Sequence, residues 1–272
     1  MQGKKKEENA IRCRVVRSYQ EFRRSAAILG EGDLVLGILP LTLQDQPILT
    51  VLLERGVRFF PSVTSQLMNG SKALQAAVLG EFMVPETVVI HRFSHLVEAM
   101  AMFERLGIKR VITKRNQGDC GRGINLWNSL EELFNMVTWA GNMDEHLYPF
   151  VLQPFIPDAL DVRVVIVGDY VEAYERMNPC SFRNNIYFGA ENAPYLLSGS
   201  QEEFCRKIME KAGFPWAHID LLLIESGEFF LSEIALNGGL KGAQISQPEC
   251  NCLKEQLMQA EVEILMKSYA NG

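Results

Sequence analysis

Three glycines and a lysine follow a short β-branched run and are the first residues whose types could do chemistry. Lys114 directly follows the run 109–113, and Gly118, Gly121 and Gly123 come after it. Glycines let backbone N–H groups approach an anion without obstruction by a Cβ atom, and the lysine supplies a positive charge. The spacing favours a loop that closes over a polyphosphate, with a plain flexible surface turn as the alternative. It matches neither a Walker A loop nor a Rossmann turn.

Two carboxylates fall on facing strands of a predicted hairpin. With its turn at residues 226–227, Asp220 and Glu233 become cross-strand neighbours. Adjacent acids repel unless a cation neutralises them, which favours a shared Mg²⁺ of the kind that carboxylates and phosphates hold. Two solvent-facing acids on an edge hairpin are the alternative interpretation. Three glycines that follow the strand favour the functional one: Gly238, Gly239 and Gly242.

Three arginines form a basic group. Arg163 lies on a predicted hairpin with its turn at 168–169, Arg176 lies at the end of that hairpin, and Arg183 follows in a long loop. Guanidinium groups on a strand face and a facing loop suit a transferring phosphoryl group or a substrate carboxylate. Ordinary surface salt bridges are the alternative for each of them.

Composition excludes several classes of protein. The 272 residues are 47% hydrophobic and carry a net charge of -6, which disfavours a general binder of nucleic acid or anionic membranes. The longest apolar stretch, 34–43, is too short to span a bilayer, and no signal-peptide pattern opens the sequence. Six scattered cysteines indicate free thiols, and we therefore expect a cytoplasmic protein.

The elements that position these residues change type along the chain. Capping boxes predict helix starts at Ser18, Ser129 and Ser200, and a last helix is expected at 252–267. The first 70 or so residues alternate helical stretches with three short strands: 12–16, 34–39 and 57–60. The two hairpins follow later, covered by helices. The predicted fold is therefore α/β followed by α+β.

The order of these features resembles the ATP-grasp superfamily, and within it the RimK-type amino-acid (glutamate) ligases. The resemblance covers roughly residues 60 to 265. The features that carry it are Lys72, GEFMVPETVVI (80–90), LGIKRVITK (106–114), the glycine loop, VLQPFI (151–156), Asp161-x-Arg163, Phe182-Arg183-Asn184-Asn185, Asp220 and Glu233.

The resemblance implies an ATP-grasp fold with a shortened N-terminal α/β domain. We expect a flexible tail at 1–10, the N-terminal domain at 11–70, a small lid subdomain at 71–150, and a large subdomain with a metal site at 151–272.

The resemblance also implies roles for residues that would hold ATP. Lys72 and Lys114 would bind phosphates, and the loop from Gly118 through Gly121 to Gly123 would close as a lid. The remaining nucleotide contacts would come from main-chain groups at Gln153, Phe155 and Ile156 for adenine, Asp161 for the ribose, and Arg183, Asn184 and Asn185 for the phosphates.

The implied reaction joins a carboxylate to an amine through an acyl phosphate. Mg²⁺, or Mn²⁺ in its place, would be held by Asp220, Glu233 and Asn237. Arg163, Arg176 and Arg183 would bind the substrate carboxylate or stabilise the intermediate. The substrates would be an amino acid and a small-molecule carboxylate or a peptide or protein C-terminus, with no nucleic acid or membrane partner. The sequence leaves self-association into a homo-oligomer open.

Two positions depart from the family pattern. Where the family has Glu-x-Asn on the metal strand, Glu233 is followed by Ala235, and Asn237 comes two residues later. Pro154 stands where the family has an acidic residue. The first departure sustains a competing hypothesis, a nucleotide-binding module with little or no ligase activity. A kinase-like use of the same fold is a third.

Overall fold

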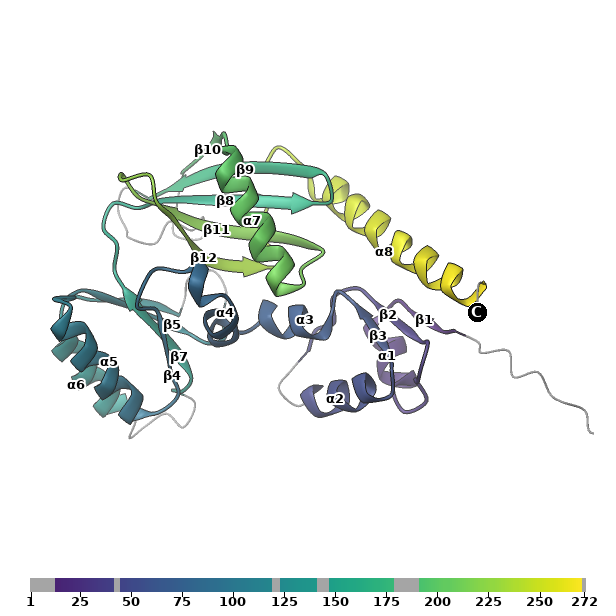
Figure 1. Ribbon diagram of the computed structural model, residues 1–272, viewed down its shortest axis with the longest axis horizontal. Coiled ribbons are helices and arrows are strands. Elements are labelled where there is room, and N and C mark those ends of the chain that lie inside the picture. The colour runs from purple at the N-terminus through teal and green to yellow at the C-terminus, as the bar shows by residue number, and fades with distance from the viewer. Residues whose placement is uncertain (1–12, 42–44, 119–122, 141–146, 179–190, 271–272) are drawn as a thin grey trace, which may run out of the picture. The chain divides into compact units, whose positions relative to one another are not determined.

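The structure, a computed structural model, describes residues 13–41, 45–118, 123–140, 147–178 and 191–270 (Figure 1). The chain divides into two compact units, one made of Met1–Val63 with Gln256–Gly272 and the other of Thr64–Glu255. The domain boundaries expected from the sequence at residues 10, 70 and 150 stay a prediction.

The first unit is a small α/β unit. Its three parallel strands, in the order β1-β2-β3, are β1 (Val15–Val16), β2 (Leu34–Leu36) and β3 (Arg58–Phe60). Parallel neighbours need crossover connections, and α1 (Tyr19–Ser25) and α2 (Gln46–Glu54) lie in these connections. Leu34 and Leu36 are buried against Leu265, near the end of α8 (Gln247–Ala270).

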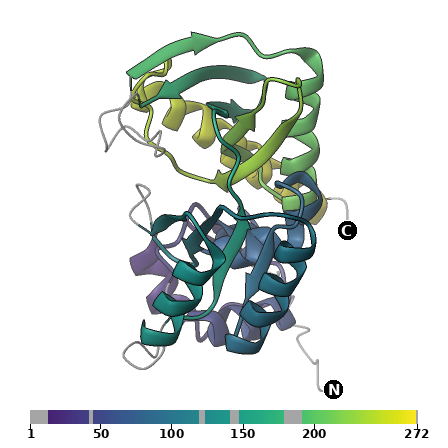
Figure 2. The same cartoon turned by 90° about the vertical axis from the view of Figure 1, so that its left-hand side faces the viewer.

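The second unit contains a four-stranded antiparallel sheet with an apolar core. Its strands, in the order β4-β7-β5-β6, are β4 (Val88–Ile90), β7 (Phe150–Pro154), β5 (Val111–Arg115) and β6 (Ile124–Trp127). Helices α5 (Phe93–Arg105) and α6 (Leu130–Ala140) lie side by side (Figure 2). Their apolar stripes pack with the strands in one buried cluster, which includes Leu96, Phe103, Val111, Leu133 and Leu152.

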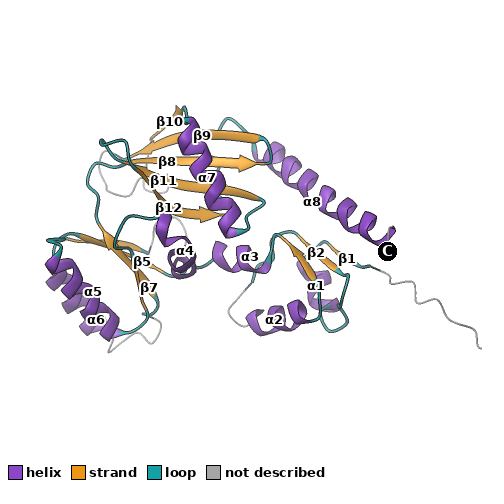
Figure 3. Ribbon diagram, viewed as in Figure 1, coloured by secondary structure: helices purple, strands orange, loops and turns teal. Residues whose placement is uncertain are grey.

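The same unit contains a five-stranded antiparallel sheet. Its order is β10-β9-β8-β11-β12, and the strands are β8 (Leu160–Val167), β9 (Tyr170–Met177), β10 (Glu191–Tyr195), β11 (Trp216–Leu223) and β12 (Phe229–Ala235). Helix α7 (Gly199–Ala212) crosses this sheet (Figure 3). Both predicted hairpins, β8–β9 and β11–β12, are confirmed.

Side-chain amides close the outer edge of β12, next to α3 (Val63–Asn69), α4 (Lys72–Leu79) and the short 3₁₀ helix η2 (Gly80–Phe82). Gln75 Nε2 donates to the carbonyl of Ile234 at 2.9 Å, and its Oε1 accepts the N–H of the same residue at 3.1 Å. Asn69 Oδ1 accepts the N–H of Leu236. An open strand edge is a template for unwanted pairing, so these amides both protect β12 and fix its position.

The helix starts follow the capping prediction in two of three cases. Ser18 and Ser129 accept hydrogen bonds from the N–H groups of Glu21 and Glu132. The prediction at Ser200 is wrong by two residues, because the capping box of α7 is formed by Ser198 and Gln201. Within the described residues, no helix has the length and apolarity needed to span a membrane.

Candidate functional site

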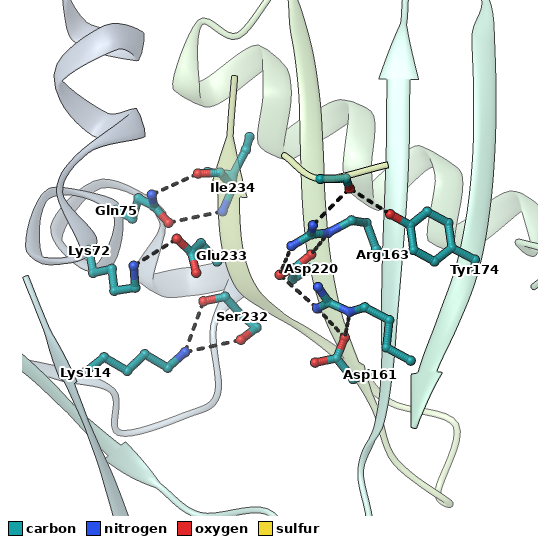
Figure 4. Close-up of polar contacts among 12 residues, drawn as sticks. Lys72, Gln75, Lys114, Asp161, Arg163, Tyr174, Asp220, Ser232, Glu233 and Ile234 are labelled. Carbon is teal, nitrogen blue, oxygen red and sulfur yellow. Dashed lines mark hydrogen bonds and ion pairs between the residues drawn. The ribbon is translucent and has the colours of Figure 1, made fainter. Parts of the chain in front are cut away.

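Lys72 links the start of α4 to the glycine loop and to β12. Its Nζ pairs with Glu233 Oε1 at 2.9 Å (Figure 4). It also donates to the carbonyl of Gly118 at 2.9 Å. A pocket of about 410 Å³ opens beside it, lined by Asn69, Gly70, Ser71, Lys72, Gln75 and Gly118. Lys72 gives the wall of this pocket a positive charge, whereas the first N–H groups of α4 already donate to Asn116 and Ser71.

Lys114 reaches β12 from the four-stranded sheet. Alternation along β5 places Val111 in the helix-covered cluster and Lys114 on the opposite face. Its Nζ donates to the carbonyl and hydroxyl oxygens of Ser232, at 3.1 and 3.2 Å. The register of β12 against β11 shifts at this point, and such a bulge frees a carbonyl from the ladder. Burial lowers the pKa of Lys114 to about 8.

Asp220 and Glu233 lie opposite each other in the β11–β12 ladder, as the hairpin arithmetic predicts. On its other side Asp220 lies opposite Arg163 of β8. Arg163 Nε and Nη2 donate to the two Asp220 oxygens at 2.7 and 2.8 Å, a bidentate pair. In the sheet register, Asp220 therefore has an arginine opposite it on one side and a second acid opposite it on the other.

Arg176 joins Asp220 to Asp161. Asp161 and Arg176 are cross-strand partners in β8 and β9, and Arg176 Nε and Nη2 both donate to Asp161 Oδ1, at 2.8 and 2.5 Å. Arg176 Nη2 also lies 2.9 Å from Asp220 Oδ2. Both carboxylates and both guanidinium groups form one network on one face of the sheet (Figure 4).

The pKa values of this network follow from burial and opposite charge. Burial by itself would raise the pKa of Asp220, but the charges of Arg163 and Arg176 and their hydrogen bonds hold it well below its ordinary value. Burial raises the pKa of Asp161 to about 6, against the lowering effect of Arg176. Both acids are thus mainly ionised at neutral pH, and each faces a positive charge.

The glycines after Glu233 allow the backbone to lie on the sheet. A Cβ atom on Gly238 would stand 2.7 Å from Nδ1 of His218, and one on Gly242 would stand 2.8 Å from Cγ of Asn192. The carbonyl of Gly239 accepts hydrogen bonds from Arg163 Nη1 at 3.3 Å and from the Tyr174 hydroxyl at 3.0 Å. The loop therefore covers the charged face of the sheet, and close packing explains Gly238 and Gly242.

The segment expected to read adenine leaves β7 beside β5. Gln153 is buried and lies opposite Ile112, two residues before Lys114. The N–H of Phe155 donates to the carbonyl of Arg110 at 3.0 Å, and the Arg110 guanidinium stacks over the Phe155 ring at 4.5 Å. Since Pro154 has no N–H, Ile156 supplies the next main-chain donor of this segment.

Several predicted site residues are not brought together by the described structure. Gly121, Arg183, Asn184 and Asn185 lie outside the described residues. At Gly123, a Cβ atom would stand 2.7 Å from that of Arg115, so this glycine permits a close pass of two strands. Roles in nucleotide binding or catalysis for all these residues stay predictions.

The predicted metal ligands already pair with cationic side chains, through every carboxylate and amide oxygen except Oε2 of Glu233. The Asp220 oxygens accept from Arg163 and Arg176, Glu233 pairs with Lys72, and Asn237 Oδ1 accepts from Lys254 Nζ at 2.9 Å. Ala235 has no donor atom to add. Among the described residues, no group of three or more His, Cys, Asp or Glu side chains could hold a metal ion. As arranged, the described residues of the site do not fit Mg²⁺ or Mn²⁺.

Some residues of the site escape prediction from sequence. Gln75, Ser232 and His218 join the site through contacts with Ile234, Lys114 and Gly238, which local spacing does not reveal. A signal existed for Gln75, because it interrupts the apolar positions of α4, between Ala73 and Ala76. His218 is buried, and its Nδ1 has no hydrogen-bond partner among the residues that the structure describes.

Comparisons with known proteins agree with this architecture. No curated protein matches the chain. Among solved structures, VanG D-Ala:D-Ser ligase from Enterococcus faecalis is 18% identical with a TM-score of 0.59, covering 83% of this chain and 73% of that one. D-alanyl-alanine synthetase A from Vibrio cholerae is 14% identical with a TM-score of 0.55, covering 83% and 77%. ATP-grasp ligase PsnB, complexed with minimal precursor, Mg and ADP, is 16% identical with a TM-score of 0.54, covering 85% and 79%.

At these identities the likeness shows a shared fold. It confirms the predicted combination of an α/β unit with antiparallel ATP-grasp sheets. The model of one family, described as the RimK-like ATP-grasp domain, matches residues 69–253. That range includes Lys72, Lys114 and all the charged strands of the site. The chain belongs to the RimK-like ATP-grasp family.

Proposed function

We propose that the protein is an ATP-dependent carboxylate–amine ligase that forms ADP. The observation that carries the proposal is the convergence of Lys72 and Lys114 on β12 and of the Arg163–Arg176 pair on Asp220 of the neighbouring β11, in a chain that belongs to the RimK-like family. Four cationic side chains from four separate elements suit a polyphosphate better than any neutral ligand.

The reaction would proceed in two steps. A carboxylate oxygen of the first substrate attacks the γ-phosphorus of ATP, and the bond to the β,γ-bridging oxygen breaks to release ADP. An amine then attacks the acyl phosphate carbon, loses a proton and displaces phosphate, which leaves an amide. Lys72 and Lys114 would offset charge on the phosphates, and Arg163 would face the transferring group.

The substrates proposed are an amino acid as the amine and a small-molecule or peptide C-terminal carboxylate as acceptor. Relatives in the comparison include ligases for D-Ala and D-Ser and a ligase for a precursor. The Arg163–Arg176 pair is the proposed binding group for the acceptor carboxylate.

Trapping of the intermediate tests the proposal. Hydroxylamine converts an acyl phosphate to a hydroxamate, so incubation with ATP, hydroxylamine and a panel of amino acids and peptides should give hydroxamate and ADP with at least one carboxylate. ATP hydrolysis without a hydroxamate, or a stable phosphorylated product without phosphate release, would contradict ligation. The second outcome would indicate a kinase-like reaction.

A second candidate is a nucleotide-binding module with little or no ligase activity. The specific observation in its favour is that Asp220, Glu233 and Asn237 each already bind a cationic side chain of the chain, while Ala235 contributes no ligand. The Ala235→Asn variant separates the two candidates. Hydroxamate formation by Ala235→Asn but not by the natural chain supports the module, whereas activity in the natural chain rules it out.

A further inference from the structure

The carboxylates on the charged face already have their counter-charges. We infer that the phosphates of the bound nucleotide are met directly by Lys72, Lys114 and Arg163, so that nucleotide binding does not depend on a divalent metal. The inference rests on the proposed function, because it takes ATP as the ligand of this site.

The backbone, rather than a choice of side-chain rotamer, places the arginines on the acids. Asp220 lies directly opposite Arg163, and Asp161 directly opposite Arg176, in two adjacent antiparallel ladders. Directly opposed residues have Cβ atoms about 4.5–5.5 Å apart, so opposite charges there contact each other by register alone. Freeing Asp220 for a metal would require the guanidinium groups to leave their register partners.

Both guanidinium groups are also held by other atoms. Arg163 Nη1 donates to the carbonyl of Gly239, and Arg176 donates twice to Asp161. The Arg176 side chain is only 4% exposed, so its guanidinium group cannot rotate into solvent. Releasing Asp220 would therefore break bonds to Gly239 or Asp161 as well, and would leave a buried guanidinium without a partner.

The charge count of the network favours an anion over a cation. Three carboxylates (Asp161, Asp220 and Glu233) face four cationic side chains (Lys72, Lys114, Arg163 and Arg176) in one connected region. The net charge of these seven described side chains is +1 before any ligand binds. A divalent ion would raise that charge in a buried site, whereas a polyphosphate would reverse it.

Two buffers test the inference on the full chain without any variant. ATP binding is measured by calorimetry with EDTA in excess over metal, and again with Mg²⁺ in excess over ATP. The two dissociation constants should agree to within about tenfold, or about 1.4 kcal/mol. Binding that is more than about tenfold tighter with Mg²⁺ overturns the inference and leaves the proposed function standing. No binding in either buffer overturns both.

A matched pair of variants sharpens the result. Arg163→Met keeps the apolar stem but removes the charge, and should weaken ATP binding in EDTA by about tenfold or more. Arg206→Met, which removes an exposed arginine paired with Glu202 on α7, should bind as the natural chain does. Unchanged binding by Arg163→Met in EDTA overturns the inference. If its circular dichroism shows misfolding, Lys72→Met replaces it, with the same expected loss.

Discussion

Two sheet faces of the second unit bury opposite kinds of side chain. The four-stranded sheet covers one face with a wholly apolar cluster that contains Leu96, Phe103 and Leu133. The five-stranded sheet buries Asp220 and Arg176 on one face, at 9% and 3% exposure, beneath a glycine-rich loop. Both are antiparallel sheets with helices beside them, so the fold class does not decide what a face contains.

The difference separates a face that is stabilised by apolar packing from a face that holds paired charges. Apolar burial is favourable for each side chain independently, at about 25 cal/mol per Å². A buried charge is tolerated only if an opposite charge is buried next to it. The β8–β9 and β8–β11 registers place that opposite charge. The helix-covered face of the four-stranded sheet should thus respond to lost volume, and the charged face of the five-stranded sheet to lost pairing.

The largest effect is expected from Arg176→Met. This change leaves Asp161 and Asp220 close together without the guanidinium that joins them. Removing one partner of a buried pair costs about 3–5 kcal/mol of unfolding free energy. Urea denaturation at neutral pH measures it, and a loss below about 1 kcal/mol would contradict the view of this face as a paired network.

The double variant Asp161→Leu/Arg176→Met distinguishes pairing from packing. It removes both charges and leaves the bidentate pair of Asp220 and Arg163 intact. We expect its stability to recover most of what Arg176→Met loses, because a buried ion pair is about neutral against apolar residues of similar volume. A loss in the double variant that equals the sum of the single losses would show that the charges do not interact.

Leu133→Ala tests the apolar sheet. Leu133 is fully buried in the cluster under α6, and truncation of such a residue costs about 2–5 kcal/mol through lost burial and the cavity left behind. No second truncation in that cluster should restore the loss, in contrast to the charged face. Urea denaturation of Leu133→Ala alone and with Leu96→Ala checks both statements.

Sequence reasoning predicts the second sheet well where the signal is local. The turn at 226–227 and the alternation around it suffice to place Asp220 opposite Glu233. The bulge beside Ser232 has no such signature, so the contact from Lys114 could not be anticipated. Likewise, the spacing shows the two acids as partners of each other, but the arginines opposite and beside Asp220 come from β8 and β9, about 57 and 44 residues away along the chain.

The glycines illustrate a partial success. The number of glycines after Glu233 indicates that the end of this strand has an unusual role. The sequence alone favours ligand binding as the reason for these glycines. The structure gives packing as the reason for Gly238, whose neighbour is the buried ring of His218. The distinction needs the partner strand, because His218 is 20 residues away from Gly238 along the chain.

Gly238→Ala should therefore destabilise the charged face. Its new Cβ would meet His218 Nδ1 at 2.7 Å, and overpacking of this kind costs about 1–3 kcal/mol. Gly239→Ala is the matched control, since a Cβ atom there meets nothing within 4 Å. Thermal melting of the two variants compares them directly. Equal melting temperatures would refute the account of Gly238 as a packing glycine.

The smallest expected effect concerns Lys114, whose side chain extends from β5 of the four-stranded sheet and contacts β12. Its pKa of about 8 in the free protein means that it loses its proton as the pH rises from 7 to 9. A neutral amine attracts phosphate less, so ATP affinity should fall by about tenfold over this range, or about 1.4 kcal/mol. Calorimetric titration in EDTA at both pH values measures the fall. Lys114→Arg stays protonated throughout and should show a flatter profile, while titration of the nucleotide itself would appear in both proteins. Equal profiles for Lys114→Arg and the natural chain would mean that this buried lysine does not bind phosphate, and the charged face would then act through Lys72 and the arginines alone.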